Sequence, residues 1–152
     1  MSQISVEEMK NAQEAFGELI KTEEERIERM KASEQVKDFS KLIRIKVGIL
    51  PGDGVGPILM EQALRVLKEL VKPEILSGKI ELHNIEGMTI ENRVEKMQSL
   101  PDEVLEEVKK CDVLLKGPMV TPRAGDGLPN LVSANSLLRR NLELFAAVRP
   151  IK

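Results

Sequence analysis

The sequence predicts an α/β fold with a mainly parallel sheet and an N-terminal helical extension. Two observations predict it. After residue 40, short apolar runs rich in β-branched residues alternate with helical patterns, which is typical of strands joined by helical crossovers. Before residue 40 the chain is charge-rich, with helical spacing of its apolar residues. We therefore expect a helical arm and linker at 1–40 and an α/β domain at 41–152.

The arm begins with a capping box, Ser5 with Glu8. Its ten acidic and six basic residues surround one apolar stripe. Such a helix is expected to pack on its own domain or on a partner subunit, because a membrane-surface helix has a basic polar face. Residues 33–40 are predicted to be the linker.

The α/β elements are expected in the order strand 43–50, a helix from Leu59 to Leu70, strand 80–85, helix 101–110 and strand 112–116. The PGDGVGP turn at 51–57 is either a dinucleotide fingerprint or a tight turn beside a cleft. Its G-x-G-x-G spacing, the proline that follows and the missing Gly-Lys-Ser/Thr favour the tight turn. In a parallel sheet, ligand residues lie just past the strand ends, where this turn and the KGP turn at 116–118 fall.

The last third of the chain predicts a pocket for a small polyanion. Ser133 suits the N-cap of a helix, with Asn135 in its first turn, where free N–H groups favour an anion. Arg139 lies further along that helix, and Arg149 follows 144–148, an apolar run expected to be a buried strand. Two guanidiniums, a hydroxyl and an amide suit a ligand with two or three carboxylates.

The segments KGPMVTP and SANSLLRRNLELFAAVRP, with ILPGDGVGP upstream, resemble the isocitrate and isopropylmalate dehydrogenase family. The resemblance covers 43–152 and leans toward the isocitrate branch, which carries the S-x-N pair. Ser136, Leu137 and Phe145 depart from the family pattern, but these changes keep the shape of the side chains.

This resemblance implies roles for six residues. Ser133, Asn135, Arg139 and Arg149 would bind the carboxylates and hydroxyl of isocitrate, while Lys116 and Thr121 would lie near the cofactor. It also implies NAD or NADP, Mg or Mn, a polycarboxylate substrate and a homodimer in the complete enzyme. The family's catalytic tyrosine and lysine and its metal-binding aspartates follow the VRP motif, so no catalytic residue or metal ligand is expected in this chain.

Three functions therefore stay open. The first is the N-terminal part of an isocitrate dehydrogenase-like oxidoreductase of the tricarboxylic acid cycle, inactive by itself. The second is a non-catalytic regulatory or binding subunit of such an enzyme, and the third is an independent nucleotide-binding module. A final strand without neighbours would expose a sheet edge, so we expect the isolated chain to be poorly stable or self-associating.

Composition restricts the classes of partner and the location that the chain can be expected to have. The net charge is −2 and the chain has neither Trp nor Tyr, which argues against nucleic acid. No apolar run has the length of a membrane span, and no signal peptide is evident. The single cysteine, Cys111, agrees with a cytoplasmic location. The only histidine, His83, is expected to be a packed or edge residue of a strand.

Overall fold

Three parallel strands form the sheet that positions the site. In the computed structural model, which describes residues 4–32, 37–123 and 125–151, they are β1 (Ile45–Leu50), β2 (Ile80–Asn84) and β3 (Val113–Lys116). Their order is β2-β1-β3, so β1 is central and both its neighbours run parallel to it. The predicted α/β class with a parallel sheet is confirmed, with each strand within two residues of its expected start.

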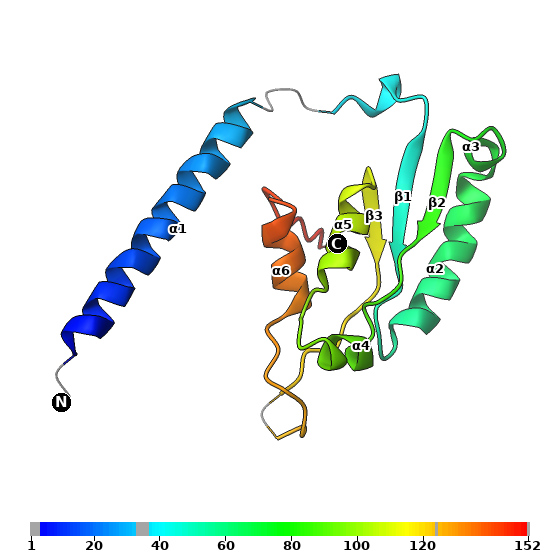
Figure 1. Ribbon diagram of the computed structural model, residues 1–152. Helices are drawn as coiled ribbons and strands as arrows, with labels where there is room; N and C mark the ends of the chain where they lie inside the picture. The colour runs from blue at the N-terminus through cyan, green and yellow to red at the C-terminus, as the bar shows by residue number, and fades with distance from the viewer. Residues whose placement is uncertain (1–3, 33–36, 124, 152) are drawn as a thin grey trace. The chain divides into compact units, whose positions relative to one another are not determined.

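In the described part of the chain, five helices follow β1. They are α2 (Gly56–Leu70), α3 (Lys72–Leu76), α4 (Ile90–Glu95), α5 (Asp102–Lys109) and α6 (Ala134–Asn141), and a short 3-10 turn at Phe39–Lys41 precedes β1. Figure 1 shows α2 beside β2 and α5 and α6 on the side of β3. A connection between parallel strands needs a crossover, and α2 with α3 supplies it from β1 to β2, while α4 with α5 supplies it from β2 to β3.

The main core joins the central strand to α5 and α6. Nine buried residues form it, and they come from β1, the segments after β2 and β3, α5 and α6: Leu50, Ile85, Met88, Leu100, Val104, Val108, Met119, Ala134 and Leu138. Burying each of the Leu, Ile, Val and Met side chains among them contributes about 1.5–3 kcal/mol. Because Ala134 and Leu138 are part of this core, α6 is held in a fixed position against α5 and the end of β1.

The N-terminal unit, 1–40, is separate from the unit 41–152, and its main element is α1 (Val6–Ala32). The predicted capping box is confirmed: the Ser5 hydroxyl accepts from the Glu8 amide at 3.2 Å, and the Glu8 carboxylate accepts from the Ser5 amide at 2.8 Å. These hydrogen bonds, that from the Ser5 backbone first, lower the pKa of Glu8. No residue of α1 is buried. Half of the predicted linker, residues 33–36, lies outside the described part of the chain.

The expected buried strand at 144–148 is wrong. Residues 144–151 have no regular structure, and Leu144, Phe145 and Val148 are exposed. Glu143 has a positive φ of 50°, and the Leu144 amide bonds back to the Arg139 carbonyl at 3.0 Å, so the chain turns at the end of α6. An apolar run becomes a strand only beside another strand, and the described sheet ends at β2 and β3 without pairing to this run.

Two expectations from the sequence concern membrane spans and His83. Within the described ranges, no helix has the length and apolar character needed to cross a membrane. His83 lies on β2 as expected, with its Nε2 atom 2.9 Å from a carboxylate oxygen of Glu107 on α5.

Candidate functional site

Two glycine turns meet at the carboxyl ends of β1 and β3. The Gly117 amide donates to the Leu50 carbonyl at 2.8 Å, and the Asp53 amide donates to the Pro118 carbonyl at 3.1 Å. A Cβ added at Gly117 would lie 2.1 Å from the Pro51 carbonyl oxygen, so the backbones touch. The PGDGVGP turn therefore packs on the KGP turn, at the sheet edge where parallel folds bind ligands.

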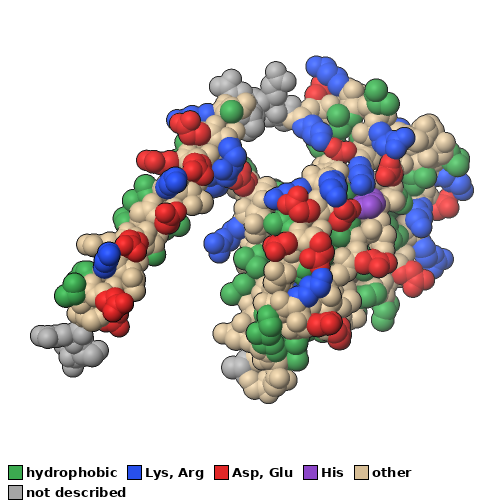
Figure 2. Space-filling view, in the orientation of Figure 1, with side chains coloured by type: hydrophobic (Ala, Val, Ile, Leu, Met, Phe, Trp, Pro, Cys, Tyr) green, Lys and Arg blue, Asp and Glu red, His purple; other side chains and the backbone are tan. Residues whose placement is uncertain are grey.

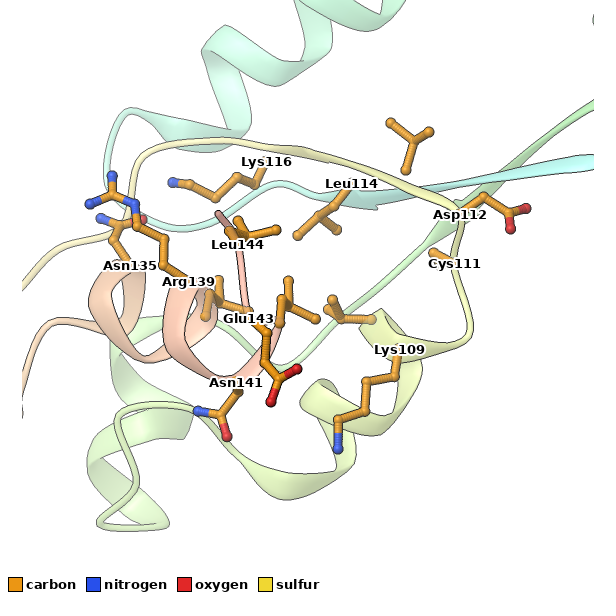
Figure 3. A pocket seen from close by; sticks show the side chains of 14 residues that line it. Lys109, Cys111, Asp112, Leu114, Lys116, Asn135, Arg139, Asn141, Glu143 and Leu144 are labelled. Atoms are coloured by element: carbon orange, nitrogen blue, oxygen red, sulfur yellow. The ribbon is translucent and has the colours of Figure 1, made fainter. Parts of the chain in front are cut away.

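A pocket of about 600 Å³ opens between β3, the end of α5 and α6. Its apolar lining includes Val108, Leu114, Leu138, Leu142 and Leu144. Lys116, Asn135 and Arg139 lie together at one end of it (Figure 3). This end of the pocket thus combines an apolar wall with two cations and an amide, which suits an anionic ligand that has some apolar surface. The other polar residues of the lining are Lys109, Asp112, Asn141 and Glu143.

The helix geometry of α6 explains how Asn135 and Arg139 come together. Ala134 and Leu138, four residues apart, are buried in the core. Asn135 and Arg139 each follow one of these residues, so they form a second row on the same side of the helix. Core packing therefore fixes the two polar side chains over the pocket.

Two polar groups at this end lack partners. The Asn135 Oδ1 atom is buried and accepts no hydrogen bond. In the part of the chain that the structure describes, no carboxylate pairs with Arg139. A buried acceptor without a donor is unfavourable by roughly 1–3 kcal/mol, so a ligand that donates a hydrogen bond there would be stabilised.

Burial and a neighbouring charge both affect the pKa of Lys116. Its amine donates to the Gly117 carbonyl at 2.9 Å. Partial burial, and then the positive charge of Arg139, lower the pKa of Lys116. Both effects disfavour the charged ammonium, so a carboxylate bound between Lys116 and Arg139 would raise that pKa again.

Arg139→Ala is expected to raise the pKa of Lys116 toward its ordinary value, because one of the two causes of the shift is removed. The check is an NMR titration of the Lys116 side-chain signals. Arg140→Ala is the matched control, since Arg140 neighbours Arg139 in sequence and is not among the residues lining the pocket. Equal Lys116 titrations in the two variants would contradict the arrangement at this end of the pocket.

The other three predicted site residues do not line this pocket. Ser133 occupies the N-cap position of α6 as expected, but its side chain makes no capping hydrogen bond. Thr121 is exposed beyond the KGP turn, and Arg149 is exposed in the irregular segment after α6. The structure therefore brings Lys116, Asn135 and Arg139 together, and Ser133, Thr121 and Arg149 are not part of this cluster.

The sequence reasoning missed a buried ion pair under the turns. Arg93 of α4 donates to an Asp53 oxygen at 2.6 Å, with side chains 0% and 4% exposed. Arg93 also donates to the Val120 carbonyl at 2.7 Å, and the other Asp53 oxygen accepts from the Val120 amide. Thr89 caps α4 by accepting from the Asn92 amide, a signal that a Thr-x-x-Asn search would have found.

No metal centre is visible in the described ranges, because no three His, Cys, Asp or Glu residues come together there. Cys111 is a free thiol beside Gly48, and burial raises the pKa of its thiol, so it is a poor thiolate ligand. The described residues therefore do not fit Mg²⁺ or Mn²⁺ by themselves.

Comparison with known proteins matches the α/β unit of this chain. The family model for isocitrate/isopropylmalate dehydrogenase matches residues 46–152. The chain is 39% identical over 111 residues to 3-isopropylmalate dehydrogenase of Candida boidinii, covering 72% of this chain and 29% of that protein. It is 31% identical over 107 residues to homoisocitrate dehydrogenase of Methanocaldococcus jannaschii, covering 70% of this chain and 28% of that protein. The chain thus spans about three-tenths of the length of these curated relatives.

Proposed function

Because the chain belongs to the isocitrate/isopropylmalate dehydrogenase family, we propose that it supplies the carboxylate-binding part of an NAD- or NADP-dependent dehydrogenase. The substrate class is a 2-hydroxy acid with two or three carboxylates, which the complete enzyme oxidises and decarboxylates. The observation that carries this proposal is the clustering of Lys116, Asn135 and Arg139 at one end of an apolar-walled pocket.

Arg139 is the primary carboxylate ligand in this proposal. It has no carboxylate partner within the described residues and lies on a helix fixed by the core. A guanidinium binds a carboxylate through two parallel charge-assisted hydrogen bonds. Burial, and then the charge of Arg139, lower the pKa of Lys116, so an anion bound beside both cations would favour the charged ammonium.

In this proposal Asn135 recognises the substrate hydroxyl, and Ser133 contacts a substrate carboxylate. The Asn135 amide oxygen needs a donor, and a 2-hydroxy acid brings one. The Ser133 side chain makes no capping bond, so its hydroxyl is free to contact a substrate carboxylate. An acid without the hydroxyl would leave the Asn135 acceptor unpaired and would bind more weakly.

Arg149 takes part only after a conformational change. It lies ten positions beyond Arg139, in the segment without regular structure, and does not line the pocket. We propose that the segment 144–149 folds over α6 when the ligand is bound, which brings the second guanidinium to the other substrate carboxylate.

Lys116, which shares the anionic end of the pocket with Arg139, and Thr121 are assigned to the part of the site where the cofactor meets the substrate. NAD or NADP supplies the hydride acceptor when bound, and Mg²⁺ or Mn²⁺ polarises the carbonyl that forms. Since the described residues hold no cluster of metal ligands, the metal ligands would come from outside them. Within this chain the chemistry is thus restricted to binding and orienting the substrate.

Isocitrate is the proposed substrate, because Ser133 and Asn135 form the S-x-N pair of that branch. The names of the relatives make 3-isopropylmalate and homoisocitrate the competitors. All three can be compared in one titration series, which ranks them by their dissociation constants.

Isothermal titration calorimetry of the chain with these three acids tests the proposal. Arg139→Ala is expected to weaken binding by about 1.5–3 kcal/mol, which is tenfold or more, because a charge-assisted contact is lost. Arg140→Ala removes the same charge next to the site and is expected to bind within about threefold of wild type. No binding by the wild type, or equal binding by both variants, would refute this carboxylate site.

A further inference from the structure

The helix α1 carries a seam with the spacing of a coiled coil. Eight positions along one face of α1 are spaced alternately three and four residues apart. Six of them are apolar, Val6, Met9, Phe16, Ile20, Ile27 and Met30, and two are polar, Gln13 and Glu23. These apolar side chains are between 45% and 89% exposed, and Figure 2 shows hydrophobic and charged side chains along α1. A repeat averaging 3.5 residues matches the seam of paired, supercoiled helices.

We propose that α1 pairs with α1 of a second copy of this chain as an antiparallel two-helix coiled coil. In this register Val6 lies opposite Met30, Met9 opposite Ile27, and Phe16 opposite Ile20 of the other copy. The helix is therefore complementary to itself, with its centre near residue 18, and every apolar seam residue meets another apolar residue.

The two polar seam positions favour this orientation over the parallel one. In an antiparallel pair Glu23 faces Gln13 of the other copy, so a charge meets an amide. In a parallel, in-register pair Glu23 would face Glu23, and like charges at a seam repel. On its own helix, Glu23 accepts from Arg26 at 2.9 Å, which partly balances its charge.

The charged residues beside the seam also favour the antiparallel orientation. Lys10 and Glu24 each follow a seam residue, and in the antiparallel register they lie beside each other twice, once on each end of the pair. In the parallel register neither position meets an opposite charge across the seam, because Glu24 would lie beside Leu19. Charge complementarity thus selects a second copy of α1, in one direction, as the occupant of the seam.

The helix is long enough for such pairing. Its 27 residues span about 40 Å and nearly four heptads, the length at which a coiled-coil seam becomes significant. The Ser5–Glu8 capping box holds the first turn, so Val6 and Met9 keep their places in the repeat. Most of the stability of a helix in a protein comes from packing of its apolar face, and burial of the seam between two copies would supply that packing.

Sedimentation of the full chain with seam and non-seam variants tests the pairing. Ile20→Glu places a charge in the seam and is expected to raise the dimer dissociation constant at least tenfold. Asn11→Glu adds the same charge on the opposite side of α1 and is expected to leave that constant within about threefold. A wild-type chain that stays monomeric, with α1 on its own α/β unit, would overturn the proposal. So would a dimer that survives Ile20→Glu, which would show association through the sheet edge or another surface.

Charge reversal tests the register. Lys10→Glu and Glu24→Lys should each weaken the dimer several-fold, while the double variant should return it close to wild type. The Lys10–Glu14 pair within the helix, at 3.7 Å, is lost in both Lys10→Glu variants, so only the contact between copies can explain a rescue. Absence of rescue would overturn the proposed register.

Spin labels test the direction of the helices. Cysteines at positions 11, 18 and 25, in a Cys111→Ser background, all lie on the side away from the seam. In the antiparallel pair the labels at 18 are closest, and those at 11 or at 25 are offset by roughly 21 Å along the axis. Three equal distances would show a parallel pair and overturn the antiparallel arrangement.

Discussion

Asp53→Ala is expected to lower the free energy of unfolding by about 3–5 kcal/mol, because it leaves the Arg93 guanidinium buried without a counter-charge. Two guanidinium nitrogens of Arg93, Nε and Nη1, already lack partners, so Asp53 is the group that compensates its charge. The variant also removes the acceptor of the Val120 amide. Urea unfolding followed by circular dichroism measures the change.

The control for this variant is an exposed ion pair. Arg44 donates to Glu81 at 2.8 Å, but their side chains are 64% and 39% exposed. Arg44→Ala is therefore expected to change stability by less than about 1 kcal/mol. If both variants lost the same stability, burial would not make the Asp53–Arg93 pair more costly to break than an exposed pair.

A double variant separates the buried charge from the lost contact. Asp53→Ala with Arg93→Met removes both charges and keeps apolar volume under the turns, so it is expected to be more stable than Asp53→Ala alone. The double variant also removes both hydrogen bonds to the backbone of Val120, the residue before Thr121, so it tests whether the buried pair fixes the position of Thr121. A double variant less stable than Asp53→Ala would mean that Arg93 contributes through its hydrogen bond to Val120 more than through its charge.

The strands β1, β2 and β3 and the helices α2, α5 and α6 were predictable because their signals are local, whereas α3 and α4 were not expected. The β-branched run before Pro51 and the helical spacing from Leu59 to Leu70 each need only neighbouring residues, and β1 and α2 formed there. The apolar run at 144–148 has the same local signal, yet it forms no strand, since a strand depends on a neighbour that local sequence does not specify.

In the candidate site, too, contacts between residues close in sequence were predictable, and contacts between distant residues were not. Asn135 and Arg139 are a helical turn apart, so their proximity followed from the predicted helix, whereas the position of Lys116, the last residue of β3, beside them was not predicted. The ion pair of Asp53 with Arg93 joins residues forty positions apart. The stretch EGMTIENR at 86–93 is typical of a loop, yet Ile90–Glu95 form α4, and the packing of this helix buries Arg93.

The contact between the two glycine turns leads to the second large effect. Gly52→Ala is expected to lower the free energy of unfolding by about 2–5 kcal/mol, for two reasons that add. Gly52 has a φ of 78°, which is unfavourable for alanine, and its new Cβ would lie 2.0 Å from the Pro118 carbonyl oxygen. The turns would have to separate, and the KGP segment that leads to the site would shift.

Two single variants divide this effect into its parts. Gly78 has a φ of 74° with open space around it, so Gly78→Ala measures the backbone conformation alone and is expected to lower stability by about 1–2 kcal/mol. Gly117 has no positive φ, but its Cβ would lie 2.1 Å from the Pro51 carbonyl oxygen, so Gly117→Ala measures the clash alone. Chemical denaturation of the three variants gives the comparison. Gly52→Ala no more destabilising than Gly78→Ala would show that the two turns can move apart freely, and the fixed geometry between β1 and β3 beneath the candidate site would then be lost.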